Sequence, residues 1–134
     1  MTVEVGQRAR RTKTVTARDV ELYTEITGDR NPLHFDPEFA ARTKFGRLVA
    51  QGGITAGMLN ALVAMDLPGP GTVFMSQSLR YLAPTYLGDT LTAEVEVLSV
   101  KPGKPVCQLK ATITNQDGTV VLEGECWTYT LQPA

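Results

Sequence analysis

The sequence predicts an α+β fold in which a long antiparallel β-sheet wraps around one buried α-helix. Residues 52–67 are almost all apolar or small, which predicts a helix that other parts of the protein cover. Residues 72–131 contain four segments with β-strand character, and glycine- or proline-containing turns separate these segments. Strands that follow one another through short turns pair in an antiparallel manner, so we expect one antiparallel sheet.

Length and composition limit the organisation of the protein. A chain of 134 residues is long enough for one hydrophobic core and too short for two ordinary domains, so we expect a single domain over residues 1–134. Hydrophobic residues make up 43% and charged residues 20%, as in an ordinary globular protein. The net charge of -1 gives no reason to expect nucleic acid as a partner, because phosphate binding requires a concentrated basic surface.

The first expected strand covers residues 8–15 and carries the only basic cluster, Arg8, Arg10, Arg11 and Lys13. Charged residues that alternate with smaller ones along a strand are typical of a solvated strand face, and this is our interpretation. The alternative is a contribution to binding the anionic end of a carrier such as coenzyme A.

The first expected helix has clear signals at both ends. Thr16 and Asp19 have the spacing of a capping box, so the helix begins near Ala17. Gly28 ends it, because glycine accepts the left-handed conformation past a helix end. Residues 29–32 then form a turn.

A second helix start follows this turn. Asp36 is a suitable N-cap residue, and Pro37 stands at the first helical position, where its missing amide costs nothing. We therefore expect a short helix through Arg42.

The helix expected over residues 52–67 has two stripes at helical spacing, one mostly of large and one mostly of small side chains. The small stripe allows a sheet or a ligand to approach closely. The large stripe consists of Ile54, Met58, Ala61, Leu62 and Met65, and the small stripe of Gly53, Ala56, Gly57, Asn60 and Ala64.

The remainder of the chain is expected to form the sheet. The four strands cover residues 72–82, 90–101, 106–115 and 119–131, and the segments between them have turn chemistry. A sheet of this length that curves around one helix is a hot-dog architecture. Its exposed edges are protected when two copies pair, so we expect a homodimer or a higher homo-oligomer.

Cys107 and Cys126 lie in apolar, β-like segments and lack the spacing of a metal or redox pair, so we expect buried, reduced thiols. Residues 1–7 show no basic leader followed by an apolar core, and no apolar run is long enough to span a bilayer. We therefore expect a cytoplasmic protein that does not enter the membrane.

Asp29 and His34 are the candidate catalytic pair. They lie five residues apart across the rigid Asn31-Pro32 turn, a separation that can bring a carboxylate and an imidazole to one point. Hydration of a conjugated double bond needs a base for the attacking water and a proton returned to the α-carbon, and this pair can supply both. The alternative is structural, with Gly28 ending a helix and an Asx-type turn after it.

Gln51, Gly52 and Gly53 open the buried helix. Free amides point out of a helix start, with the positive end of the helix dipole behind them. Glycine lets a thioester carbonyl come close, so we interpret the Gly52 amide as the donor to the oxyanion. The alternative is that the two glycines only permit tight packing of the helix on the sheet.

A longer pattern contains these residues and resembles the MaoC-like family of (R)-specific enoyl-CoA hydratases. The resemblance extends from Thr16 to the last strand. It implies a hot-dog fold, a homodimer and reversible hydration of trans-2-enoyl-CoA to (R)-3-hydroxyacyl-CoA. It also implies no metal or redox cofactor, because coenzyme A is part of the substrate, and it assigns Asp29 and His34 as the catalytic dyad and the Gly52 amide as the thioester contact. The pattern is Tyr23-x-x-x-Thr27-Gly28-Asp29-x-Asn31-Pro32-x-His34-x-Asp36, followed by Gln51-Gly52 and by Gln77-Ser78-Leu79.

Asn31, Gln51, Gly53 and Gly57 are the residues that we expect to bind the substrate. Members of the family often have His-Gly where this chain has Gln51-Gly52, and some have a serine at the position of Gly57. Gln51 could alter loop order or rate, and Gly57 opens space. The preferred length and branching of the acyl chain therefore do not follow from the sequence.

The leading hypothesis is a hydratase, and which of Asp29 and His34 is the formal base stays open. One alternative keeps the fold and reverses the direction, dehydrating a 3-hydroxyacyl group on acyl carrier protein. A hot-dog thioesterase is a weaker rival, because its water must attack the carbonyl. A non-catalytic thioester-binding partner subunit is the last alternative, and retention of both Asp29 and His34 argues against it.

Overall fold

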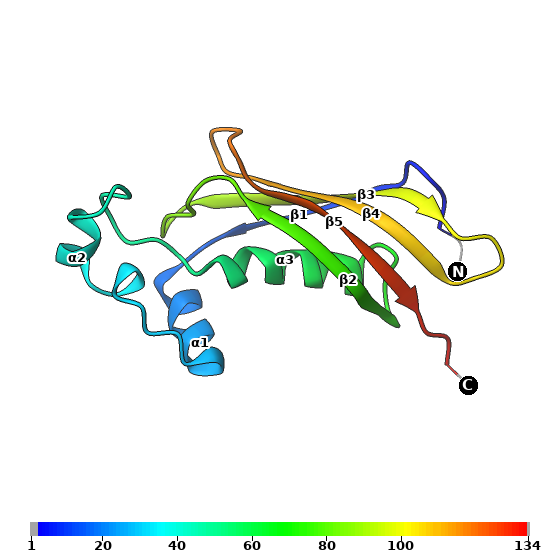
Figure 1. The fold of residues 1–134 in the computed structure, drawn as a ribbon, viewed down its shortest axis with the longest axis horizontal. Helices are drawn as coiled ribbons and strands as arrows, with labels where there is room; N and C mark the ends of the chain where they lie inside the picture. The colour runs from blue at the N-terminus through cyan, green and yellow to red at the C-terminus, as the bar shows by residue number, and fades with distance from the viewer. Residues whose placement is uncertain (1–2, 134) are drawn as a thin grey trace.

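A computed structural model describes residues 3–133, which contain a five-stranded antiparallel sheet with the strand order β1-β3-β4-β5-β2. Helix α3 lies along one face of this sheet, and α1 and α2 lie at one end of the molecule (Figure 1). Of the predicted domain, Met1, Thr2 and Ala134 lie outside the described residues. The elements are β1 (Arg8–Thr14), α1 (Ala17–Thr27), a 3-10 helix η1 (Pro32–His34), α2 (Pro37–Ala41), α3 (Gly52–Met65), β2 (Thr72–Tyr81), β3 (Thr90–Val100), β4 (Val106–Thr114) and β5 (Val120–Thr130).

Helix α1 begins and ends where the sequence predicts. The Asp19 amide donates to Thr16 Oγ1 at 3.2 Å, and the Thr16 amide donates to Asp19 Oδ2 at 2.9 Å, which completes the capping box. Gly28 follows the helix with φ of 79°, and its amide donates to the Thr24 carbonyl oxygen at 2.8 Å. This left-handed glycine turns the chain toward Asp29.

Helix α3 begins at Gly52 as predicted, and it contacts β1, β2, β3 and α1. The stripe of large side chains is buried only in part. Leu59 and Val63 are buried, whereas Met65 is 59% exposed. The reason is that a helix with apolar residues on almost every side does not specify from its own sequence which face meets the sheet.

The sheet supplies the other half of the core. Along β3 every second side chain points inward, as strand geometry requires. These positions meet α3 and the inward-facing side chains of β4 and β5 in one hydrophobic cluster. The four inward residues of β3, all fully buried, are Leu91, Ala93, Val95 and Val97.

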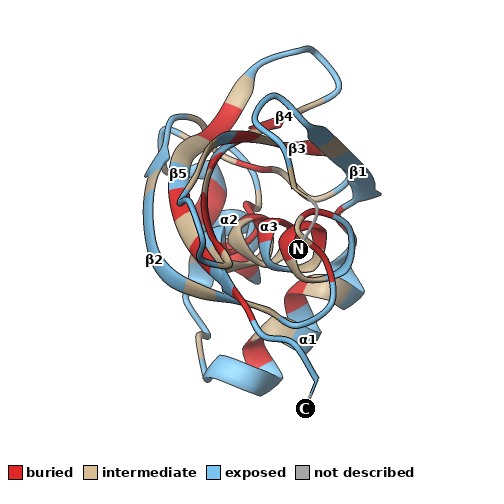
Figure 2. Ribbon diagram, turned by 90° about the vertical axis from the view of Figure 1, so that its right-hand side faces the viewer, coloured by how far each residue is buried: buried red, intermediate tan, exposed pale blue. Residues whose placement is uncertain are grey.

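The strand order separates β2 from its sequence neighbours β1 and β3. The four predicted strands are confirmed to within about one residue, but β2 pairs with β5 at one edge of the sheet, and β1 pairs with β3 at the other. Strand β2 is mostly exposed, as the pale blue ribbon in Figure 2 shows. Val73, Met75 and Tyr81 on this strand are 47%, 59% and 57% exposed. An exposed edge strand with apolar side chains is a surface on which another strand can pair.

The basic cluster lies on β1, which is mostly exposed, and each of its four cations faces a carboxylate. Surface pairs of this kind contribute little to stability. The N–O distances are 3.2 Å for Arg8–Glu96, 3.0 Å for Arg10–Glu94, 2.7 Å for Arg11–Asp66 and 3.0 Å for Lys13–Asp19.

Both cysteines are buried and free, as predicted. Burial raises the pKa of Cys126 to about 12, and burial also raises the pKa of Cys107. Both thiols therefore stay protonated at neutral pH. Within residues 3–133, no helix is long and apolar enough to cross a lipid bilayer.

Candidate active site

Three hydrogen bonds hold Asp29, two through its backbone and one through its side chain. The Asp29 amide donates to Thr27 Oγ1 at 3.1 Å, and its carbonyl accepts from the Thr24 hydroxyl at 2.7 Å. One carboxylate oxygen, Oδ1, accepts from the Asn31 amide at 3.1 Å. The other oxygen, Oδ2, points to His34 and lies 3.6 Å from its Nε2 atom.

The His34 side chain is held from the opposite side of its ring. It is the last residue of η1, and its amide donates to the Asn31 carbonyl at 3.0 Å. Its Nδ1 lies 2.7 Å from the Val49 carbonyl oxygen, and the side chain is only 8% exposed. Since a carbonyl oxygen can only accept, the proton of the neutral ring is on Nδ1, and Nε2 carries the lone pair.

The two atoms that face each other are both acceptors when His34 is neutral. Their separation of 3.6 Å is longer than a direct hydrogen bond. A water molecule has two hydrogens and can donate one to Asp29 Oδ2 and one to His34 Nε2. This geometry allows the pair to bind a water molecule and to accept its proton.

The segment before α3 joins this pair to the helix start. The Val49 amide donates to the Leu33 carbonyl at 3.1 Å, and the Ala50 amide donates to the Thr85 carbonyl at 2.7 Å. The segment is thus tied to the His34 turn on one side and to the β2–β3 connection on the other. Gly52 follows directly and is exposed, and among residues 3–133 its amide has no hydrogen-bond partner.

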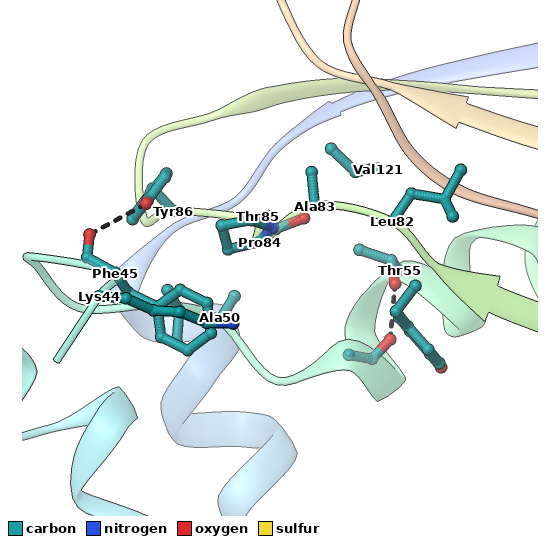
Figure 3. Close-up of a pocket in the computed structure, with 13 residues that line it drawn as sticks. Lys44, Phe45, Ala50, Thr55, Leu82, Ala83, Pro84, Thr85, Tyr86 and Val121 are labelled. Atoms are coloured by element: carbon teal, nitrogen blue, oxygen red, sulfur yellow. Dashed lines mark hydrogen bonds between the residues drawn. The ribbon is translucent and has the colours of Figure 1, made fainter.

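A cavity of about 620 Å³ lies at the start of α3 (Figure 3). Gly52 and Thr55 line it from the helix, and Phe45 and Ala50 line it from the preceding segment. The connection after β2 closes the other side, where the Tyr86 hydroxyl donates to the Phe45 carbonyl at 3.0 Å. The cavity therefore borders the residue whose amide is free within the described part of the chain.

The structure brings only some of the predicted site residues to this place. Asn31 caps η1, with its Oδ1 accepting from the Leu33 amide at 3.1 Å, so its side chain shapes the turn. Gln51 is buried, being 2% exposed. Gly57 lines a second cavity of about 400 Å³, between α3 and β1, which also includes Arg11 and Lys13. Of the seven predicted residues, Gly52 alone lines the larger cavity.

Both glycines at the helix start lie against tyrosine rings. A Cβ atom at Gly53 would lie 1.7 Å from the Tyr23 hydroxyl oxygen, and one at Gly52 would lie 2.8 Å from Tyr81 Cε1. Burial and the nearby Tyr23 raise the pKa of Tyr81, so its hydroxyl stays protonated. A side chain at either position would therefore have to displace the facing tyrosine ring, independently of any role of the Gly52 amide.

Two residues of the site were not identified from the sequence. Thr24 bonds to Asp29 through its hydroxyl, and Val49 bonds to His34 through its backbone carbonyl. Every residue has a carbonyl, so the identity of Val49 carries no signal for this contact. The described part of the chain contains no group of three or more His, Cys, Asp or Glu residues that could hold a metal ion.

Comparisons with known proteins show which family the chain resembles. A family model described as MaoC like domain matches residues 2–120. The chain is 40% identical over 123 residues to an (R)-specific enoyl-CoA hydratase of Aeromonas caviae, covering 92% of each chain. It is 43% identical to a 3-hydroxybutyryl-CoA dehydratase of Methylorubrum extorquens, covering 92% of this chain and 78% of that protein. A solved (R)-hydratase from A. caviae involved in PHA biosynthesis superposes with a TM-score of 0.93 and 38% identity, covering 97% of this chain and 98% of the other.

Proposed function

Because this chain belongs to the MaoC-like domain family, we propose that it is an (R)-specific enoyl-CoA hydratase. It adds water reversibly to trans-2-enoyl-CoA and gives (R)-3-hydroxyacyl-CoA. The observation that carries the proposal is the 3.6 Å pair of Asp29 Oδ2 and His34 Nε2, two acceptors that can share one water.

The proposed step uses the dyad and the Gly52 amide. The oxygen of the bound water forms a bond to the β-carbon of the enoyl thioester, and the dyad takes the proton that this water releases. The electron pair of the carbon–carbon double bond forms a new double bond between the α-carbon and the carbonyl carbon. The π pair of the carbonyl moves onto the thioester oxygen, where the Gly52 amide stabilises the negative charge of this enolate. A proton then returns to the α-carbon, so that the elements of one water are added and nothing is oxidised or reduced.

Support for the role of Gly52 comes from its exposure and from the cavity beside it. The amide at a helix start carries partial positive charge and is already oriented before the substrate binds. In other enzymes one such donor is worth about 3–4 kcal/mol of transition-state stabilisation. We propose that the acyl thioester occupies the cavity of about 620 Å³, with its carbonyl oxygen at Gly52. The reaction needs no cofactor besides the coenzyme A of the substrate.

A direct assay tests the function. Hydration removes the conjugation between the double bond and the thioester, so the absorbance of crotonyl-CoA falls as product forms. We expect the purified protein to catalyse this loss and to form the (R) enantiomer. Absence of activity on short, medium and branched enoyl-CoAs would overturn the proposal. Competition between coenzyme A and carrier-protein substrates then identifies the preferred carrier.

We also propose that the protein is a homodimer. Support comes from β2, an edge strand whose Val73, Met75 and Tyr81 are exposed. Pairing with a second copy covers these side chains and removes an open edge. Light scattering after size-exclusion chromatography is expected to give twice the mass of 14.5 kDa.

We propose a cytoplasmic location as well, and the two free, buried cysteines support a reducing compartment. Cell fractionation that places the protein in another compartment would contradict this location.

A further inference from the structure

A buried chain of hydrogen bonds connects the residue before Gly52 to the residue that carries the catalytic carboxylate. Gln51 Nε2 donates to Thr24 Oγ1 at 3.0 Å, and the Thr24 hydroxyl donates to the Asp29 carbonyl oxygen at 2.7 Å. Gln51 and Thr24 are 2% and 4% exposed. These hydrogen bonds connect the start of α3, through Thr24 of α1, to the loop that contains Asp29 and His34.

The Asp29 carbonyl oxygen, at one end of this series of hydrogen bonds, determines which group donates in each of them. The Asp29 carbonyl can only accept, so the hydroxyl hydrogen of Thr24 is used there, and the Thr24 oxygen must accept from its other neighbour. Gln51 Nε2 meets this need with one hydrogen and donates the other to the Val20 carbonyl at 3.3 Å. Rotating the amide would place Oε1 against the Val20 carbonyl, which is a contact between two acceptors.

This orientation leaves Gln51 Oε1 buried and without a partner among residues 3–133. An unpaired buried acceptor is unfavourable, so the two donor contacts must offset its cost. The side chain is also almost completely covered, which leaves it little surface with which to touch a substrate. The hydrogen bonds of the Gln51 side chain are thus those that Nε2 donates to Val20 and Thr24.

We infer that Gln51 and Thr24 are positioning residues that hold the Asp29 carboxylate at a set place relative to the Gly52 amide. The inference rests on the proposed hydratase function. The Asp29 carbonyl lies on the same residue as the reacting carboxylate, and Gln51 is bonded directly to Gly52. The water-binding dyad and the oxyanion donor are thereby joined by two side chains as well as by the Val49 carbonyl at His34. A small displacement of reacting groups is enough to cost on the order of 100-fold in rate.

Thr24 gives the sharpest test, because two substitutions separate its hydroxyl from its shape. Thr24→Val keeps the shape and removes the hydroxyl, and Thr24→Ser keeps the hydroxyl. We expect Thr24→Val to lower kcat about 10- to 100-fold with little change in KM, and Thr24→Ser to retain most of the activity. Thr128→Val is the matched control: it removes another fully buried threonine hydroxyl, on β5, and is expected to leave kcat unchanged.

A double-mutant cycle tells whether Thr24 acts through Asp29. Asp29→Asn removes the carboxylate that Thr24 is inferred to position. Adding Thr24→Val to Asp29→Asn is therefore expected to lower kcat no further. Additive losses would overturn the inference, as would a folded Thr24→Val variant with the kcat of the wild type. A loss of activity in Thr24→Ser with full activity in Thr24→Val would show that the shape matters and the hydroxyl does not, which overturns it too.

An NMR measurement keeps the inference separate from the proposed function. His34 is the only histidine in the chain, so its ring resonances are assigned without ambiguity. Movement of Asp29 is expected to shift the His34 resonances in Thr24→Val and to leave them in place in Thr24→Ser and Thr128→Val. Unshifted resonances in Thr24→Val overturn the positioning role even if the wild type is active. An inactive wild type whose Thr24→Val resonances shift as expected overturns only the hydratase function.

Discussion

The carbonyl oxygen of Val49 lies 2.7 Å from Nδ1 of His34. This contact holds the imidazole in the tautomer whose Nε2 lone pair faces Asp29. Val49 stands three residues before Gly52, so the segment that selects the tautomer also leads to the amide proposed to bind the thioester oxygen. The two halves of the proposed chemistry are therefore connected by a short, hydrogen-bonded piece of backbone.

The first prediction concerns the dyad. Asp29→Asn keeps the size of the side chain but removes its negative charge, and His34→Ala removes the imidazole. We expect each to lower kcat for crotonyl-CoA about 100- to 10,000-fold, because each removes one of the two groups that handle the proton. The melting temperature of Asp29→Asn should change little, since Asp29 is partly exposed. Asp117→Asn, in the exposed β4–β5 turn, is the control and should have the wild-type rate.

The second prediction contrasts two glycines of α3. A Cβ atom at Gly53 would lie 1.7 Å from the Tyr23 hydroxyl, whereas one at Gly57 meets no atom within 4 Å. We expect Gly53→Ala to lower the free energy of unfolding by about 1–3 kcal/mol through overpacking. Gly57→Ala should raise it by about 0.5–1 kcal/mol, because alanine is the better helix former. Urea denaturation measures both, and a Gly53→Ala variant as stable as the wild type would contradict the packing.

The third prediction is a pH dependence at the capping box. Burial acts to raise the pKa of Asp19, but hydrogen bonds from Thr16 and Lys13 outweigh it, so the pKa lies below its ordinary value of 3.8. A lowered carboxyl pKa in the folded state gives stability that is complete above about pH 4 to 5 and is lost as the pH falls through the folded value. We expect Asp19→Asn to cost about 0.5–1 kcal/mol at pH 7.

The difference between wild type and Asp19→Asn should shrink as the pH falls from 3.8 through the lower pKa of Asp19 in the folded protein, because the carboxyl of the wild type then becomes neutral, like the Asn side chain. Thermal unfolding of both proteins from pH 7 to pH 2.5 measures this. A difference that stays constant across the range would show that the charge of Asp19 does not contribute.

The fourth prediction concerns the thiols. Cys107 and Cys126 are buried, and burial raises the pKa of both, that of Cys126 to about 12. The thiolate is the reactive form, so neither should react with a disulfide reagent at pH 8 while the protein is folded. In denaturant both should react, giving two thiols per chain. Rapid labelling of the native protein would contradict the burial of these side chains.

Local signals in the sequence predicted much of the fold. The Thr16–Asp19 capping box and Gly28 bound α1 correctly, because a cap involves groups that are only three or four residues apart. The strand ranges also matched, since alternation and turn residues are local properties. The pairing of β2 with β5 was not predicted, because it depends on contacts between residues about 50 positions apart.

For the site, the sequence by itself determined the five-residue spacing of Asp29 and His34 and the glycine start of α3. These follow from residue types and from short turns whose geometry is nearly independent of the remaining chain. Only the tertiary structure decided that the Val49 carbonyl orients His34 and that Gln51 reaches Asp29 through Thr24. The physical reason is that one contact uses a backbone atom common to all residues, and the other requires α1 and α3 to pack side by side.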